Sequence, residues 1–172
     1  MASIRHIPLE WGGDSAGVLQ TLRIMRDLVK KSDNYRIVKN TAAYLIKDID
    51  PRNKPNQIRA IFNYVQTYMR YVADIAKVEE ITAPWLHLAK IAKQGWSFGD
   101  CDDFATLTAA LLRSVGFQMA FSAIATGRKG ELFDHVRAQV KFNDQWLPLE
   151  ATAKGREPGW TLPKVKELVL EL

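Results

Sequence analysis

The chain has 172 residues, of which 47% are hydrophobic and 25% are charged. This composition is typical of one globular domain, and it excludes a mainly disordered chain, a collagen-like repeat and a coiled coil. The sequence holds a single cysteine, Cys101, which excludes an internal disulfide and any multi-cysteine zinc or iron–sulfur site. A lone thiol also fits a reducing compartment.

The net charge of +5 lies in the first third of the chain. Residues 1–60 hold 11 Lys and Arg against 6 Asp and Glu, whereas residues 61–172 hold 13 basic and 13 acidic residues. No dense basic run or Gly-aromatic RNA signature accompanies this excess. We therefore expect a solvated basic surface, and the alternative is that it meets an acidic protein partner. Nucleic-acid binding through residues 20–60 is a weaker alternative.

We expect neither a membrane span nor an export signal. No segment approaches the ~18 apolar residues of a membrane span, and the first residues have no apolar signal core. The sequence predicts a soluble cytoplasmic protein without a membrane partner.

The first third of the chain is expected to be irregular and then helical. Residues 1–18 contain one proline and three glycines, which break any regular pattern. From Thr21 onward, apolar residues at spacings of three and four predict a helix, and a second helix is predicted over residues 36–48. Residues 50–55 contain two prolines and should end this helical part.

Two further helices are expected before the cysteine. Asn56 should open a helix whose apolar stripe runs to Val72. Residues 78–84 are expected to form a loop or a short strand. The pattern over residues 85–93 predicts a short helix that stops at Gly95, since glycine is common just beyond a helix end.

The second half has a different pattern. Residues 100–103 lead into an apolar stretch that ends before Gly116, which predicts a buried helix with an acidic start. Residues 117–126 are apolar and strand-like, and residues 127–130 predict a hairpin-type turn.

Alternation marks the next strand, which is predicted over residues 135–142. Its apolar face carries Val136, Ala138, Val140 and Phe142, and its polar face carries His135, Arg137, Gln139 and Lys141. Asn143 and Asp144 should turn the chain, so that residues 145–149 pair back. The tail from Ala151 should be irregular, with a closing helix from Pro163. Helices followed by antiparallel strands indicate an α+β fold.

The position of Cys101 suggests chemistry. Backbone N–H groups at a helix N-terminus stabilise an anion and so favour a thiolate. Taken alone, a cysteine is more often a small buried hydrophobe. However, His135 opens an alternating strand, and Glu150 follows the next strand, so the hairpin can bring these two side chains together. Cysteine, histidine and carboxylate are the parts of a thiol triad.

Three segments resemble the transglutaminase-like superfamily in order and spacing. Gly99-Asp-Cys-Asp-Asp-Phe-Ala105 resembles the family's nucleophile segment, and His135-Val-Arg-Ala-Gln-Val140 resembles its histidine strand. Trp146-Leu-Pro-Leu-Glu-Ala-Thr152 resembles its segment of tryptophan, acid and threonine. The resemblance covers about residues 56–155 and implies a papain-like α+β core, in which the nucleophile helix packs on an antiparallel sheet. We expect residues 1–55 to be an added N-terminal helical extension and residues 56–172 to be the catalytic domain, within one compact unit.

The resemblance implies a role for each site residue. Cys101 becomes the nucleophile, His135 the general base, and Glu150 the third member, at a position where the family usually has Asp. The oxyanion hole would use the Cys101 N–H and an upstream donor, for which Gln94 and Trp96 are the candidates. If Glu150 is not the third member, Asp134 and Asp144 are the next candidates.

No cofactor is expected to be required. Asp100 and Asp102 resemble the acids that can hold calcium beside the cysteine in bacterial transglutaminase-like cysteine proteinases, and calcium takes several oxygen ligands. The alternative is that these acids cap the helix in solvent. His6 and His87 have no partner at metal-ligand spacing, so no zinc site is predicted.

The resemblance favours a cysteine peptidase or amidase that acts on a protein or peptide. Transfer to water would make it a hydrolase, and transfer to an amine would make it a transglutaminase. Compact members also occur in phage and prophage genomes, in which case the protein could be associated with a virion. The alternative function is a structural or adaptor protein that uses the fold for binding, which the Glu at position 150 and the unmatched basic first third favour.

Overall fold

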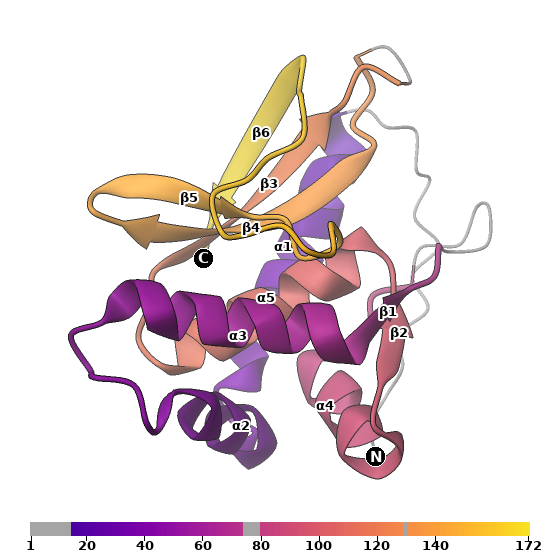
Figure 1. The fold of residues 1–172 in the computed structure, drawn as a ribbon. Helices are drawn as coiled ribbons and strands as arrows, with labels where there is room; N and C mark the ends of the chain where they lie inside the picture. The colour runs from indigo at the N-terminus through magenta and orange to yellow at the C-terminus, as the bar shows by residue number, and fades with distance from the viewer. Residues whose placement is uncertain (1–14, 74–79, 129–130) are drawn as a thin grey trace.

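A computed structural model describes residues 15–73, 80–128 and 131–172, and it confirms an α+β fold (Figure 1). Helices dominate the first half of the chain, and a four-stranded sheet is built from the second half. The helices are α1 (Ser15–Ser32), α2 (Arg36–Ile46), α3 (Lys54–Tyr68), α4 (Pro84–Gln94) and α5 (Cys101–Ser114). The strands are β1 (Met69–Tyr71), β2 (Ser97–Gly99), β3 (Met119–Ala125), β4 (His135–Phe142), β5 (Gln145–Leu149) and β6 (Lys166–Glu171).

Helix α5 is the centre of the molecule. It packs against β3 and β4 and also against α1, α2, α3 and α4, so it lies between the sheet and the other helices. Every residue from Asp102 to Leu112 is buried. Small side chains, among them Ala105 and Ala109, let its backbone approach the sheet closely, and they share one core with Ala138 of β4.

The four-stranded sheet has the order β5-β4-β3-β6, and every neighbouring pair is antiparallel. Strands β4 and β5 form the hairpin that the sequence predicts. Asn143 and Asp144 close it with φ angles of 51° and 58°, the left-handed conformation that two-residue hairpin turns need. This turn fixes the register, in which Ala138 lies opposite Leu149.

Helices α1 and α2 contribute to the same core as α5. Val18, Leu22, Met25 and Val29 form a fully buried stripe along α1. Helix α1 starts at Ser15, earlier than expected, because burial of Val18 outweighs the cost of a glycine in the first turn. The division of the chain at residue 55 stays a prediction. The expectation for residues 1–14 lies outside the described part of the chain.

The third helix is shorter at its end than expected. Asn53 caps it by accepting the Asn56 N–H at 3.2 Å, and it stops at Tyr68 rather than Val72. The chain then continues as β1, which pairs in parallel with β2 just before the cysteine. Tyr68 and Val72 are 38% and 51% exposed, so of the last apolar residues of the predicted stripe only Met69, which is fully buried, lies in the core.

The closing helix expected from Pro163 is wrong. The residues from Lys166 onward form β6, which pairs with the edge of β3 left open by the hairpin. Apolar Leu168 and Leu170 alternate with Glu167 and Glu171, a period of two that suits a strand. Because β5 and β6 lie at opposite edges of the sheet, residues 150–165 cross from one edge to the other (Figure 1).

The short helix predicted over residues 85–93 is confirmed as α4, and residues 80–83 of the expected loop belong to no helix or strand, while residues 78–79 lie outside the described part of the chain. Gly95 ends α4 with a φ angle of 86°, as a helix-stopping glycine does. Helix α3 begins at Lys54, two residues before the predicted start at Asn56, because Pro55 is accepted in the first turn of a helix. Residues 129–130 of the expected turn lie outside the described part of the chain. None of the helices in residues 15–73, 80–128 and 131–172 is both long enough and apolar enough to cross a membrane.

Candidate active site

Cys101 is the first residue of α5. Asp100 precedes it as the helix cap, and its carboxylate accepts the Asp102 N–H at 3.3 Å. The cysteine is partly buried. The helix start predicted around this residue is therefore confirmed, and the backbone N–H groups of the first turn favour a thiolate there.

His135 and Glu150 are hydrogen-bonded. His135 Nε2 lies 2.5 Å from Glu150 Oε1, and the two side chains are 12% and 1% exposed. His135 is the first residue of β4, and Glu150 directly follows β5, so the hairpin register brings them together. This contact leaves Nδ1 as the second ring nitrogen of His135.

The two alternative acids have other roles. Asp134 accepts hydrogen bonds from the backbone N–H and the hydroxyl of Thr126, at 2.8 and 2.6 Å. These bonds anchor the start of β4, directly beside His135. Asp144 is exposed in the hairpin turn. Of the three candidate acids, Glu150 is the one whose carboxylate binds His135.

Arg137 lies next to the second carboxylate oxygen of Glu150. Its Nη1 atom is 3.7 Å from Glu150 Oε2, and its side chain is 2% exposed. The guanidinium also donates to Thr161 through Nη1 and to Glu167 Oε1 through Nη2, the latter at 3.0 Å. The sequence places Arg137 on a polar strand face, which suggests exposure, but the chain after β5 covers this face.

The carboxylate of Glu167 on β6 accepts hydrogen bonds from several side chains. Its carboxylate accepts from Ser122 Oγ at 2.6 Å and from Gln139 Nε2 at 3.2 Å, and it also binds Lys164 Nζ. Burial acts to raise the pKa of Glu167, but the hydrogen bonds from Lys164, Ser122 and Arg137 outweigh it and lower the pKa to about 2. Glu167 is therefore an anion at every pH of interest.

The helix of Cys101 and the strand of His135 are in direct contact. Helix α5 packs against β4 along the sheet, and Cys101 and His135 are the first residues of these two elements. The hairpin adds Glu150 to the same strand pair. A thiol at a helix start and an imidazole bound to a buried carboxylate are the parts of a thiol acyl-transfer site. That the side chains of Cys101 and His135 meet stays a prediction.

The two oxyanion candidates lie just before the cysteine segment. Gln94 ends α4 and is exposed, and its Nε2 donates to the Trp96 backbone carbonyl at 3.0 Å. Trp96 is half-buried between the guanidinium of Arg70, 4.3 Å from its ring, and Phe98. In this arrangement the Gln94 amide is committed to a local bond, and an oxyanion role for either residue stays a prediction.

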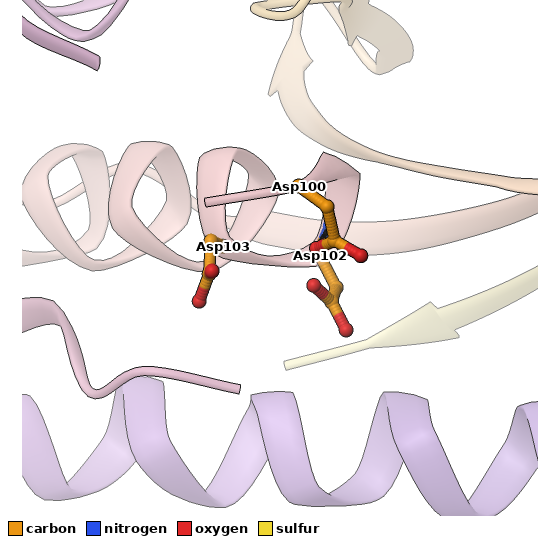
Figure 2. A group of neighbouring side chains, drawn as sticks. All are labelled: Asp100, Asp102 and Asp103. Carbon is orange, nitrogen blue, oxygen red and sulfur yellow. Dashed lines mark hydrogen bonds between the residues drawn. The ribbon is translucent and has the colours of Figure 1, made fainter. Parts of the chain in front are cut away.

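Three carboxylates gather at the first turn of α5, from Asp100, Asp102 and Asp103 (Figure 2). Their ligand atoms lie within 4.8 Å of one another, and all three residues are buried. Asp103 Oδ1 accepts the Thr82 N–H at 2.7 Å and lies 3.2 Å from His87 Nε2. Burial raises the pKa of Asp103, while His87 and the Thr82 N–H act in the opposite direction.

His87 is a residue that sequence reasoning missed. It is fully buried on α4, and its Nδ1 atom lies 2.8 Å from Ser97 Oγ. Through Ser97 and Asp103 it links α4 to the strand before the cysteine and to the helix after it. Gly99 belongs to the same cluster, because a Cβ atom there would lie 2.1 Å from Asp103 Oδ2. A single histidine on an apolar helix face gave no signal of this role.

These contacts bear on the expected calcium site. Calcium takes six to eight oxygen ligands. Asp100 already caps the helix, and Asp103 already binds Thr82 and faces His87, so part of the oxygen set is in use. A calcium ion held by Asp100 and Asp102 stays a prediction, and no step described below depends on it.

The sequence matches a known family. The sequence model of the transglutaminase-like superfamily matches residues 29–151. The match begins ahead of residue 56, and so it includes part of the segment that the three motifs leave uncovered. No curated protein matches the sequence.

Solved structures with a similar fold include two bacterial proteins. One is a proposed protease from Parabacteroides distasonis, with a TM-score of 0.58 and 14% identity over 75% of this chain. The other is a proposed cysteine protease from Cytophaga hutchinsonii, with a TM-score of 0.51 and 18% identity over 77% of this chain. This chain therefore spans only part of those two chains, 25% and 45% of their lengths. At 14% and 18% identity, the comparisons show a shared fold.

Proposed function

The chain belongs to the transglutaminase-like superfamily, and on this premise we propose that it is a cysteine peptidase or amidase with Cys101, His135 and Glu150 as its triad. The observation that carries the proposal is the 2.5 Å hydrogen bond between His135 Nε2 and Glu150 Oε1. A buried carboxylate on one imidazole nitrogen fixes the tautomer and leaves the other nitrogen, Nδ1, to accept a thiol proton. Cys101 at the start of the helix packed on this strand is the thiol in question.

The reaction begins with transfer of the Cys101 thiol proton to His135. The thiolate sulfur attacks the carbonyl carbon of a peptide or amide, a C–S bond forms, and the carbonyl electron pair moves onto oxygen. The Cys101 N–H and one upstream donor, from Gln94 or Trp96, would stabilise this oxyanion. When the carbonyl re-forms, the C–N bond breaks, and the amine leaves with the proton that His135 held.

The thioester is then released. Water gives one proton to His135 and attacks the acyl carbon, after which the C–S bond breaks and the sulfur takes the proton back. An amine in place of water would make the same enzyme a transglutaminase. The two bacterial proteins of similar fold are both described as proposed proteases, which supports water as the acceptor.

The test is the rate at which iodoacetamide alkylates Cys101 as a function of pH. The ordinary cysteine pKa is about 8.5, so an unassisted thiol reacts slowly below neutral pH. An assembled triad should hold a reactive thiolate at pH 6, and the His135→Gln variant should lose this reactivity. Because Cys101 is the only cysteine in the sequence, the label reports on a single site.

The outcomes separate the two functions that the sequence leaves open. Fast alkylation at pH 6 that depends on His135 supports the enzyme, and peptide hydrolysis can then be sought with a peptide library. Alkylation no faster than that of free glutathione, and unchanged in His135→Gln, would overturn the triad. The adaptor function, in which the fold only binds, would then be the better explanation.

A further inference from the structure

A buried arginine, Arg137, lies next to Glu150, the acid of the proposed triad. Arg137 stands between Val136 and Ala138 in β4, and since these two face the core shared with α5, Arg137 points to the opposite face of the sheet. Arg137 Nη1 lies 3.7 Å from Glu150 Oε2, and Glu150 Oε1 binds His135 Nε2. A charged side chain that is 2% exposed is costly unless its partners compensate it, so its contacts indicate what it does there.

Glu150 has two oxygens, and only one is held by the histidine. Oε1 binds His135 Nε2, while Oε2 is buried without a hydrogen bond among the described residues. Within the described residues, the cation that faces Oε2 is Arg137, whose Nη1 lies 3.7 Å away. Glutamate has one more rotatable bond than the aspartate usual at this position, so the second oxygen needs a fixed partner if the first is to stay on His135.

Arg137 is in turn held in place from the far edge of the sheet. Nη2 donates to Glu167 on β6, and Nη1 donates to Thr161 in the segment that crosses between β5 and β6. Glu167 is anchored by Ser122 of β3 and Gln139 of β4. The chain of contacts therefore runs from β6 through Arg137 to Glu150 and ends at His135.

We propose that Arg137, held by Glu167, is a positioning residue that fixes the Glu150 carboxylate and sets how tightly the His135–Glu150 pair holds its proton. This inference rests on the proposed function, because it gives the pair a role in activating Cys101. It adds two residues to the site, Arg137 and Glu167, neither of which touches the substrate. It also explains how a glutamate can serve where an aspartate is usual.

Arg137 and Glu167 carry opposite charges, so the loss of each should shift the pKa of the His135–Glu150 pair in opposite directions. The charged groups linked to it by contacts are Arg137 on β4, Glu167 on β6 and Lys164 before β6, and the proposed function adds the Cys101 thiolate. Loss of Arg137 leaves the deprotonated His135–Glu150 pair as an uncompensated anion, so the pair should release its proton at higher pH. Loss of Glu167 leaves Arg137 uncompensated, so the pair should release its proton at lower pH.

The experiment is an NMR titration of the histidine rings in the full chain. The chain has three histidines, and the resonance that disappears in His135→Gln belongs to His135. Arg137→Gln should raise the apparent pKa of the pair, and Glu167→Gln should lower it, each by about one unit. Glu171→Gln is the matched control, because it makes the same change at an exposed position on the same strand.

A purely structural role would not produce opposite shifts. Shifts in the same direction, or no shift in either variant, would overturn the proposal. If Arg137→Gln does not fold, Arg137→Lys keeps the charge and loses the second donor, and Glu167→Gln, whose side chain is 23% exposed, still tests the sign. Glu167 stays ionised throughout the titration, because its pKa is about 2.

The two proposals can fail separately. Slow alkylation of Cys101 in the unmodified protein would end the proposed function, whereas the histidine titration still measures whether Arg137 and Glu167 control the pair. If alkylation is fast and the titration shows opposite shifts, Arg137→Gln should also speed alkylation at pH 6, by up to about tenfold for a shift of one unit, because a raised pKa of the pair makes His135 a stronger base for the thiol proton. An alkylation rate unchanged in Arg137→Gln would mean that Arg137 does not act through Glu150.

Discussion

Glu150 has a longer reach than the aspartate usual at this position, and the structure gives this extra length a use. Leu149, opposite Ala138, is the last paired residue of β5, and Glu150 follows it. From there the carboxylate reaches His135 with one oxygen and approaches Arg137 with the other. A shorter side chain could keep one of these contacts more easily than both.

Replacing Glu150 tests its place in the triad. We expect Glu150→Gln to slow Cys101 alkylation at neutral pH by at least about 100-fold, because an amide cannot stabilise the imidazolium. Glu150→Asp should retain reactivity, because the family usually has Asp here. If Glu150→Gln has the same pH profile as the unmodified protein, Glu150 is not the third member and the site is a Cys101–His135 dyad.

Removing the thiol should abolish chemistry and leave the fold intact. Cys101→Ala deletes one partly exposed atom at a helix start, so we expect a loss of less than about 1 kcal/mol in the free energy of unfolding and no remaining amidase or transamidase activity. Urea unfolding and a hydrolysis assay are the measurements. A large loss of stability would instead indicate that the sulfur is a core atom.

For single residues, the sequence predicted site candidates where the residue type itself carries chemistry. Cys101, His135 and Glu150 stand out because few roles combine a thiol, an imidazole and an acid at helix and strand starts. Arg137 and His87 gave no signal, since an arginine on an alternating strand predicts a solvated face. Only the crossing of the chain over that face, a tertiary feature, buries it.

Among the elements, the start of α5 is held by several buried polar contacts. Asp103 ties it to Thr82, and His87 of α4 lies against the same carboxylate. Gly99 leaves the space that the Asp103 side chain fills. The position of Cys101 thus depends on a buried polar cluster as well as on the apolar face of its helix.

This cluster makes a prediction about pH. Burial raises the pKa of Asp103 above its ordinary value of 3.8, although His87 and the Thr82 N–H oppose the shift. The folded protein then binds more protons than the unfolded chain, so this residue's contribution to stability falls as pH rises from about 4 through the raised pKa. Asp103→Asn keeps the acceptor for Thr82 and removes this titration.

We therefore expect the free energy of unfolding of Asp103→Asn to increase, relative to that of the unmodified protein, between pH 4 and pH 7. Urea unfolding at several pH values measures it, with exposed Asp144→Asn as the control. A difference that does not vary with pH would mean that Asp103 has an ordinary pKa in the folded protein.

Elements with strong periodicity were predicted well, and elements decided by pairing were not. The hairpin of β4 and β5 agrees with its predicted bounds, because alternation and the turn at Asn143 act locally. Strand β6 was expected as a helix, since a short mixed segment has no strong preference until β3 offers it an open edge. The end of α3 at Tyr68 has the same origin, because pairing with β2 draws the next residues into β1.

Across the whole molecule, the basic first third is both part of the core and part of the surface. Its apolar residues pack with α5, while Lys30, Arg36 and Lys39 are exposed. We propose that this surface binds an acidic protein partner. A cytoplasmic or virion location and a phage origin stay predictions.

The basic surface can be tested with a poly-glutamate peptide as the acidic probe. Binding should weaken steeply as salt is raised from 0.05 to 0.5 M, because exposed charges more than about 10 Å apart are screened at 0.1 M. Glu substitutions at Lys30, Arg36 and Lys39 should remove the binding and leave Cys101 alkylation unchanged. Binding that does not depend on salt would contradict an electrostatic role.

The boundary predicted at residue 55 has its own test. A chain that starts at residue 56 would expose the faces of α5 that α1 and α2 cover. We expect this truncated chain to lack cooperative thermal unfolding, because the lost contacts include the buried stripe of α1. A truncated chain that unfolds cooperatively and retains reactive Cys101 would show that residues 1–55 are a separable extension.

The turn at Asn143 and Asp144 has a consequence for how sequences of this kind can vary. One residue inserted there, or one lost, would shift the strand register and turn every side chain of β5 to the other face of the sheet. Glu150 would then point into the apolar core, away from His135, although no residue of the site had changed. We therefore expect natural variants to tolerate substitutions on the exposed strand positions and to keep the length of this turn, so that a gap of one residue at its tip, far from the thiol, would mark a descendant that has lost the chemistry.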